Sequence, residues 1–166
     1  MRRTLPLALA LALSLIVGTA PAEAAQTVMC RSYKWKCDGG QGYNPNHSYW
    51  SQLPGHNCTN YVAFRMIKDG APANFGPFHG NAKEWDNYFR SRGYKVNGTP
   101  RVGAIAQWNA GEGGRYHRSG HVAYVSKVTD TYIIVDEDAW HGNSMRRKIF
   151  KGDAGWPGRF IHMVKA

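Results

Sequence analysis

Cysteine, acidic residues and long apolar runs are all scarce in this sequence of 166 residues. It contains three cysteines but no Cys-x-x-Cys or His-Glu-x-x-His pattern, so the ligand spacing of common zinc sites is missing. The 21 Lys and Arg residues outnumber 11 Asp and Glu, and the acid-poor N-terminal part offers few ligands for calcium. We therefore expect neither a metal site nor another cofactor.

The one long apolar run lies near the N-terminus. Two arginines follow Met1, then residues 5–17 are mainly Leu, Ala, Ile and Val, and an Ala-x-Ala site follows at 22–24. This layout predicts a secretory signal peptide over residues 1–25 and a single secreted domain over 26–166, located outside the cell or in the cell wall. An uncleaved membrane anchor is the alternative, but the run is short for a bilayer. No later segment is apolar enough to span one, so we expect a mature chain without a transmembrane segment.

The basic charge indicates possible partners but no reaction. Loss of Arg2, Arg3 and Glu23 with the leader changes the formal net charge from +10 to +9. Such a protein is attracted to anionic cell-wall polymers and peptidoglycan, to anionic membranes and to nucleic acid. Its basic residues are scattered and match no nucleic-acid-binding motif, so we expect no specific nucleic-acid partner. We also expect a monomer.

The cysteine count singles out one residue. Cys30 and Cys37 enclose six residues in a polar segment, and in an exported protein they can form a disulfide that stabilises by roughly 2–3 kcal/mol. Cys58 is then left over, and such a cysteine is either an intermolecular bridge or a reactive thiol.

Periodicity predicts helices first and strands second. Residues 26–57 are rich in Gly, Asn, Ser and aromatics, which is typical of loops. Hairpin-like connections among the strands favour an α+β fold in which N-terminal helices pack on an antiparallel sheet. The expected helices are 58–69 and 82–92, and the expected strands are 102–108, 121–128, 132–137, 147–151 and 159–164.

Cys58 lies at the expected start of a helix, directly after the possible N-cap Asn57. Free N–H groups and the helix dipole at that end stabilise a thiolate, which is the nucleophilic form of cysteine. The same donors can receive the oxyanion of an acyl intermediate, and the Asn57 side chain is a further candidate donor. An inert core cysteine is the alternative.

A base and an orienting acid follow from the expected hairpin. His121 begins a strand rich in Val, Ala and Tyr. With a turn centred near Thr129, His121 lies opposite Glu137 on one sheet face, whereas Asp136 and Asp138 point the other way. A register slip of one residue would move Glu137 to the other face. This arrangement predicts a nucleophile, base and acid of the kind found in hydrolytic triads.

Four segments in order resemble the CHAP family, the cysteine- and histidine-dependent amidohydrolases and peptidases. Residues 55–63, Gly-His-Asn-Cys-Thr-Asn-Tyr-Val-Ala, look like its nucleophile segment, and residues 100–108 resemble the strand before its histidine. Residues 120–125, Gly-His-Val-Ala-Tyr-Val, match its histidine strand, and residues 136–137 fall where the family often has Ser-Glu.

The resemblance implies a papain-like α+β fold and hydrolysis of a peptidoglycan amide bond, with Cys58 as nucleophile, His121 as base and Glu137 as orienting acid. The chain departs from the family at Ala139, where an asparagine that assists the histidine is often found. Asn143 is a possible substitute.

Six tryptophans give a further hint of substrate binding. Trp50 and Trp140 lie in expected loops near the motifs and could stack on sugar rings, although packing in an aromatic core is the alternative. Three functions stay open on the sequence: a peptidoglycan amidase or endopeptidase, a cysteine-hydrolase toxin with another substrate, and a basic wall-binding protein without catalysis.

Overall fold

The computed structural model describes residues 26–32, 42–75, 80–114, 118–139 and 143–163. Along the chain these residues form, in order, β1 (Gln26–Ser32), η1 (Tyr49–Ser51), α1 (Cys58–Lys68), η2 (Ala82–Glu84), α2 (Trp85–Ser91), β2 (Lys95–Asn97), β3 (Ile105–Trp108), η3 (Glu112–Gly114), β4 (His121–Val128), β5 (Tyr132–Ala139), β6 (Asn143–Phe150) and β7 (Arg159–His162).

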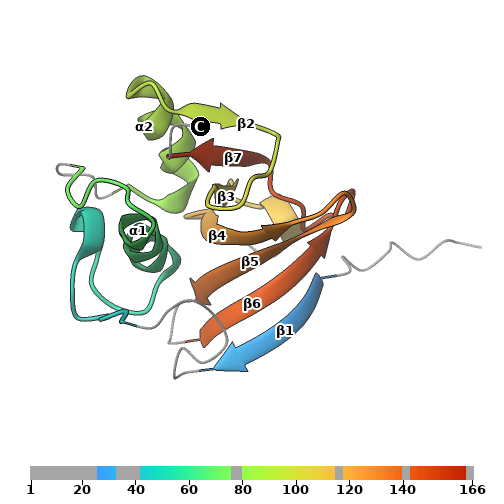
Figure 1. The fold of residues 1–166 in the computed structure, drawn as a ribbon, viewed down its shortest axis with the longest axis horizontal. Helices are drawn as coiled ribbons and strands as arrows, with labels where there is room; N and C mark the ends of the chain where they lie inside the picture. The colour runs from blue at the N-terminus through green and yellow to red at the C-terminus, as the bar shows by residue number, and fades with distance from the viewer. Residues whose placement is uncertain (1–25, 33–41, 76–79, 115–117, 140–142, 164–166) are drawn as a thin grey trace, which may run out of the picture.

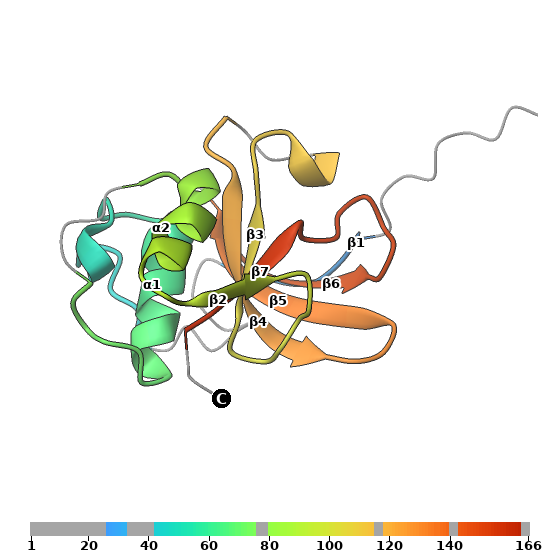
Figure 2. The ribbon, with the colours of Figure 1, turned by 90° about the horizontal axis from the view of Figure 1, so that it is seen from above.

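Seven strands form one sheet in the order β1-β6-β5-β4-β3-β7-β2, and every paired neighbour runs antiparallel. The helices α1 and α2 lie beside this sheet on one side (Figures 1 and 2). The expected α+β class, with helices packed on an antiparallel sheet, is therefore confirmed.

Both predicted helices begin where their caps place them. The Asn57 side chain accepts a hydrogen bond from the Asn60 N–H at 2.8 Å at the start of α1, and Gly70, with φ +92°, follows its end. The second predicted helix starts as the 3-10 turn η2, where the Asn81 N–H donates to Glu84 Oε2 at 2.9 Å. These side chains satisfy N–H groups that the helix cannot pair internally.

The alternating side chains of the central strands contribute to two cores. One core lies between the sheet and the helices and includes Val122 and Tyr124 of β4. Ala123 and Val125 of the same strand belong to the second core, together with residues of β3, β5 and β6. Burial on both faces explains why β4 reads as an almost continuous apolar run.

The N-terminal region and the strand boundaries differ from the prediction. Residues 26–32 form β1 at the sheet edge instead of a loop, and β2 was not predicted. Val28 and Met29 are 39% and 48% exposed, so β1 lacks the apolar alternation that marks a half-buried strand. Its pairing with β6, which starts at Asn143 and not at Arg147, depends on a partner more than a hundred residues away.

Candidate active site

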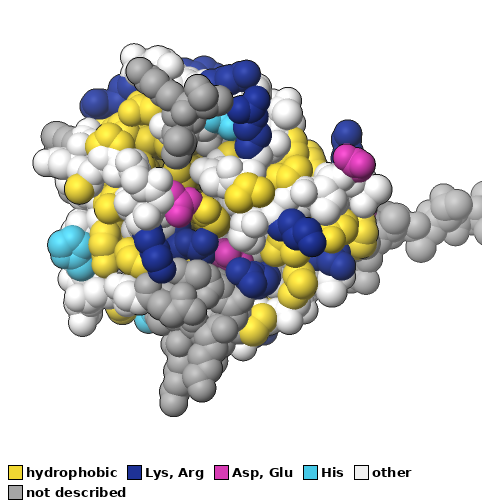
Figure 3. Space-filling model, viewed as in Figure 1, with side chains coloured by type: hydrophobic (Ala, Val, Ile, Leu, Met, Phe, Trp, Pro, Cys, Tyr) yellow, Lys and Arg dark blue, Asp and Glu magenta, His cyan; other side chains and the backbone are white. Residues whose placement is uncertain are grey.

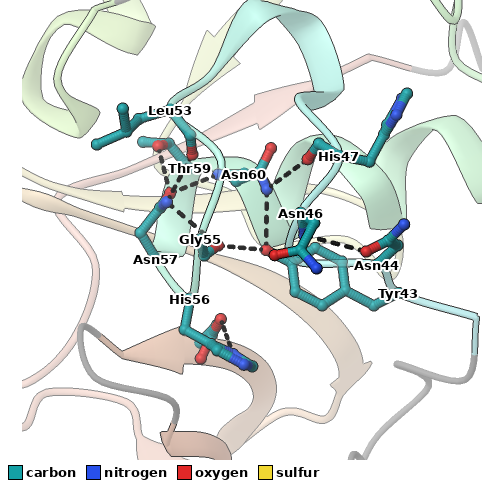
Figure 4. Close-up of polar contacts among 11 residues, drawn as sticks. Tyr43, Asn44, Asn46, His47, Leu53, Gly55, His56, Asn57, Thr59 and Asn60 are labelled. Atoms are coloured by element: carbon teal, nitrogen blue, oxygen red, sulfur yellow. Dashed lines mark hydrogen bonds and ion pairs between the residues drawn. The ribbon is translucent and has the colours of Figure 1, made fainter.

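The thiol of Cys58 lies at the first residue of α1 and is free and partly exposed. The loop before it is fixed by the Asn57 side chain, whose Oδ1 also accepts from Thr59 Oγ1 at 2.9 Å. The Asn57 amide nitrogen donates to the carbonyls of Leu53 at 2.8 Å and Gly55 at 3.3 Å. Figure 4 shows these groups gathered at the start of the helix. Asn57 therefore acts as the N-cap, and these bonds argue against its predicted role as an oxyanion donor.

A second set of bonds ties the same loop to the preceding chain. The Asn60 amide donates to Tyr43 Oη and to the His47 carbonyl, both at 3.0 Å, and Tyr43 Oη donates to the Gly55 carbonyl at 2.8 Å (Figure 4). Asn60 has no exposed surface. The position of the helix start, and with it the thiol, is thus determined by buried hydrogen bonds on both sides of the loop.

His121 begins β4 and is 8% exposed. Its Nε2 lies 2.7 Å from Glu137 Oε2, and its ring also hydrogen-bonds the Cys58 side chain. Burial lowers the pKa of His121, but the charges and hydrogen bonds of Cys58 and Glu137 outweigh burial and raise that pKa to about 9. Because Glu137 holds Nε2, we assign the contact with the thiol to Nδ1. The structure thus brings the three predicted triad residues together.

The contact between His121 and Glu137 arises from a different register than expected. The pairs Tyr124↔Asp136 and Val125↔Val135 are offset by two residues from the predicted pairing. The turn closes at Thr129, whose N–H donates to the Tyr132 carbonyl at 2.9 Å. A β-bulge between Val125 and Lys127 then inserts one extra residue into β4. An offset of two keeps Glu137 on the predicted face, so it reaches the histidine diagonally.

The three consecutive acids of β5 are completely buried and alternate in their partners. Asp136 contacts Arg65 of α1 at 3.1 Å and Arg146 at 2.7 Å, and Asp138 contacts His56 Nδ1 at 3.1 Å. Both point away from the partners of Glu137, as predicted. Burial lowers the pKa of His56, which lies on the opposite side of the loop from Asn60 (Figure 4). The pairs with Arg65 and His56 join β5 to the helix and the loop that carry the thiol.

Sequence reasoning missed the partner of Glu137 on β6. Arg147 is 4% exposed, and its Nη2 lies 2.5 Å from Oε1 and 2.6 Å from Oε2 of Glu137. Burial raises the pKa of Glu137, but Arg147 and His121 outweigh burial and lower that pKa to about 2. The signal in the sequence was a basic residue in a predicted neighbouring strand, which becomes informative only when the β5–β6 register is known.

The other predicted site residues have different outcomes. Trp50 is 2% exposed, donates to the Pro72 carbonyl at 2.8 Å and contacts Phe75, so it packs in the core and the stacking role was wrong. Trp140 lies outside the described residues. Cys37 does too, so its disulfide with Cys30 stays a prediction.

The described residues contain no group of three or more His, Cys, Asp or Glu side chains placed to hold a metal. Every helix among them is too short or too polar to cross a membrane.

Fold and site together define a small α+β protein with a cysteine at a helix start, a histidine on the neighbouring sheet and a buried acid behind it. The sequence profile of the CHAP domain matches residues 44–139, which include all three side chains. The chain therefore belongs to the CHAP domain family.

Several relatives come from staphylococci. The N-acetylmuramoyl-L-alanine amidase sle1 of Staphylococcus epidermidis is 34% identical over 114 residues, which cover 66% of this chain and 33% of that protein. The staphylococcal secretory antigen SsaA of Staphylococcus aureus is 45% identical over 71 residues, covering 43% of this chain and 24% of the antigen. The chain thus spans about a third or less of the length of these relatives.

A solved structure supports the same fold. The crystal structure of an N-acetylmuramoyl-L-alanine amidase from Staphylococcus aureus superposes with a TM-score of 0.60 at 29% identity, over 76% of this chain and 36% of that one. The papain-like α+β arrangement expected from the sequence is thus shared with this amidase.

Proposed function

We propose that the protein is a secreted cysteine hydrolase that cleaves an amide bond of peptidoglycan. The observation that carries this proposal is the position of His121, which contacts both the Cys58 thiol and the Glu137 carboxylate. A basic protein without catalysis has no need for such an arrangement. The amidases among the relatives and the shared fold support the substrate class.

In the first half-reaction, the Cys58 thiolate attacks the amide carbonyl carbon and the electron pair moves to the carbonyl oxygen. We assign the main-chain N–H of Cys58, at the positive end of α1, as a donor to that oxyanion. The His121 imidazolium then gives its proton to the leaving nitrogen, the carbon–nitrogen bond breaks and a thioester forms. Glu137 keeps the ring oriented and stabilises its positive charge.

In the second half-reaction, neutral His121 takes a proton from water as the oxygen attacks the thioester carbonyl. The carbon–sulfur bond breaks, the acid product leaves, and the thiolate–imidazolium pair is restored. Atoms and charges therefore balance with the substrate amide, one water molecule and the side chains of Cys58 and His121.

Digestion of purified cell walls followed by mass spectrometry tests the reaction and identifies the bond. A new N-terminal alanine with a free lactyl carboxylate indicates an N-acetylmuramoyl-L-alanine amidase, and other new amines indicate a stem or cross-bridge endopeptidase. Cys58→Ala should abolish release, whereas Ser91→Ala, altered at an exposed hydroxyl of α2, should not. Release by Cys58→Ala would exclude the nucleophile. Inert wild-type protein that adsorbs to walls would favour the wall-binding alternative, and inert protein that does not adsorb would favour a substrate outside the wall.

We also propose that the net positive charge holds the protein on the wall. On the face in Figure 3, Lys and Arg side chains are spread over several areas, while few Asp and Glu side chains reach the surface. Such a distribution favours attraction to anionic polymers without one binding site.

Alkylation of the unreduced protein should modify one thiol per chain if Cys30 and Cys37 form the predicted disulfide.

A further inference from the structure

Glu137 is held from two strands at once. His121 Nε2 contacts one carboxylate oxygen from β4, and the Arg147 guanidinium contacts both oxygens from β6. In the β5–β6 register Arg147 lies opposite Val135, two residues before Glu137, so both side chains are on the same face and meet diagonally.

Arg147 is also fixed on its other side. Its Nη1 donates to Gln26 Oε1 at 2.7 Å, a contact with the first residue of β1 at the sheet edge. A guanidinium that is 4% exposed and bonded to two strands can hold one orientation, unlike an arginine on the surface. The guanidinium is therefore a fixed counter-charge to the carboxylate.

We infer that Arg147 is a positioning residue of this active site, which holds the Glu137 carboxylate against His121 and thereby promotes the thiolate–imidazolium pair with Cys58. The inference rests on the proposed catalytic triad but not on the identity of the substrate. Arg147 has no assigned contact with substrate and acts through Glu137.

The physical reason lies in the complete burial of Glu137. A carboxylate without exposure stays ionised only if nearby cations and donors offset its lost hydration. Among the described residues, His121 is the cation that still contacts it without Arg147, and the proton of the imidazolium can then be shared with the carboxylate. A neutral Glu137 no longer stabilises the imidazolium, and the thiolate loses its partner.

The neighbouring Arg146 provides a matched control. It lies on the same strand, carries the same side chain and is also paired with a buried acid, through Nε to Asp136 Oδ1 at 2.7 Å. Asp136 keeps its contact with Arg65 when Arg146 is replaced. Arg146→Met therefore removes a paired arginine from β6 without touching the carboxylate that contacts His121.

Alkylation of Cys58 by iodoacetamide is the direct assay, because its rate reports the thiolate fraction without any substrate. Between about pH 5 and 7, we expect Arg147→Met to react at least about tenfold more slowly than wild type. Arg146→Met should follow the wild-type profile. Arg147→Lys keeps the positive charge but has one nitrogen in place of the two that contact Glu137 and Gln26, so it should fall between the two.

A double-mutant cycle separates positioning from general stability. If Arg147 acts through Glu137, Glu137→Gln combined with Arg147→Met should react at the rate of Glu137→Gln alone. Multiplicative effects of the two changes, or a wild-type profile for folded Arg147→Met, would overturn the inference. Alkylation that follows these expectations in a protein that releases nothing from walls would instead leave the inference standing and reject the proposed substrate.

Discussion

Replacing Glu137 with glutamine removes a buried negative charge while keeping the size of the side chain. The carboxylate has no exposure and lies between His121 and Arg147, and its pKa is lowered from 4.5 to about 2. That change in pKa corresponds to roughly 3 kcal/mol of stability at neutral pH. Loss of one partner from a buried ion pair costs about 3–5 kcal/mol, which is the same order. We therefore expect Glu137→Gln to lower the free energy of unfolding by about 3 kcal/mol at neutral pH.

The pH dependence gives the prediction a definite sign. Because the folded-state pKa lies below the unfolded value, the carboxylate stabilises the protein fully above about pH 5 and loses this effect as the pH falls towards about 2. The stability difference between wild type and Glu137→Gln should therefore shrink by about 2 kcal/mol between neutral pH and about pH 3. Titrating groups that do not contact Glu137 contribute equally to both proteins and cancel in this difference.

Urea unfolding of both proteins across this pH range is the assay. Glu112→Gln serves as control, because Glu112 pairs with Arg159 at 2.8 Å but its side chain is 35% exposed, and it should cost less than about 1 kcal/mol. A loss for Glu137→Gln no larger than that of the control, or a difference that does not change with pH, would refute the account of Glu137 as a buried, ionised carboxylate.

Four further outcomes are expected. Burial lowers the pKa of His121, but Cys58 and Glu137 together raise it to about 9. The value of kcat/KM should therefore fall as the pH rises through about 9. A decrease of kcat/KM with rising pH that is already complete below neutral pH would contradict this. Arg65→Met should cost about 3–5 kcal/mol in urea unfolding because it leaves a buried acid with one partner fewer, whereas exposed Arg90→Met should cost less than about 1 kcal/mol. Loss of the N-cap in Asn57→Ala should cost about 1–2 kcal/mol in thermal unfolding, and Asn57→Ser, which keeps a cap oxygen, should cost less. Adsorption to walls should weaken at high salt in a sedimentation assay, and equal adsorption at low and high salt would argue against charge-based targeting.

The sequence alone was sufficient to predict the features that depend on interactions between residues close in the chain. Asn57 before Cys58 predicts the helix start because a cap acts within three residues of itself. The apolar runs around His121 and Glu137 predict two neighbouring strands, since hairpins pair segments close in the chain. The cysteine count singled out Cys58, and its thiol is free in the structure. The proposed nucleophile, base and acid were all within reach of such arguments.

The tertiary structure decided which side chains meet. With the observed turn and no bulge between Val125 and Lys127, the register would place Asp136 or Asp138 on the face of His121, so the bulge selects Glu137. Arg147 reaches that acid through pairing between β5 and β6, and Gln26 joins it from a strand that the sequence does not reveal. Local propensity carries no information on such pairings, because their free energy comes from burial and charge contacts between segments distant in the chain.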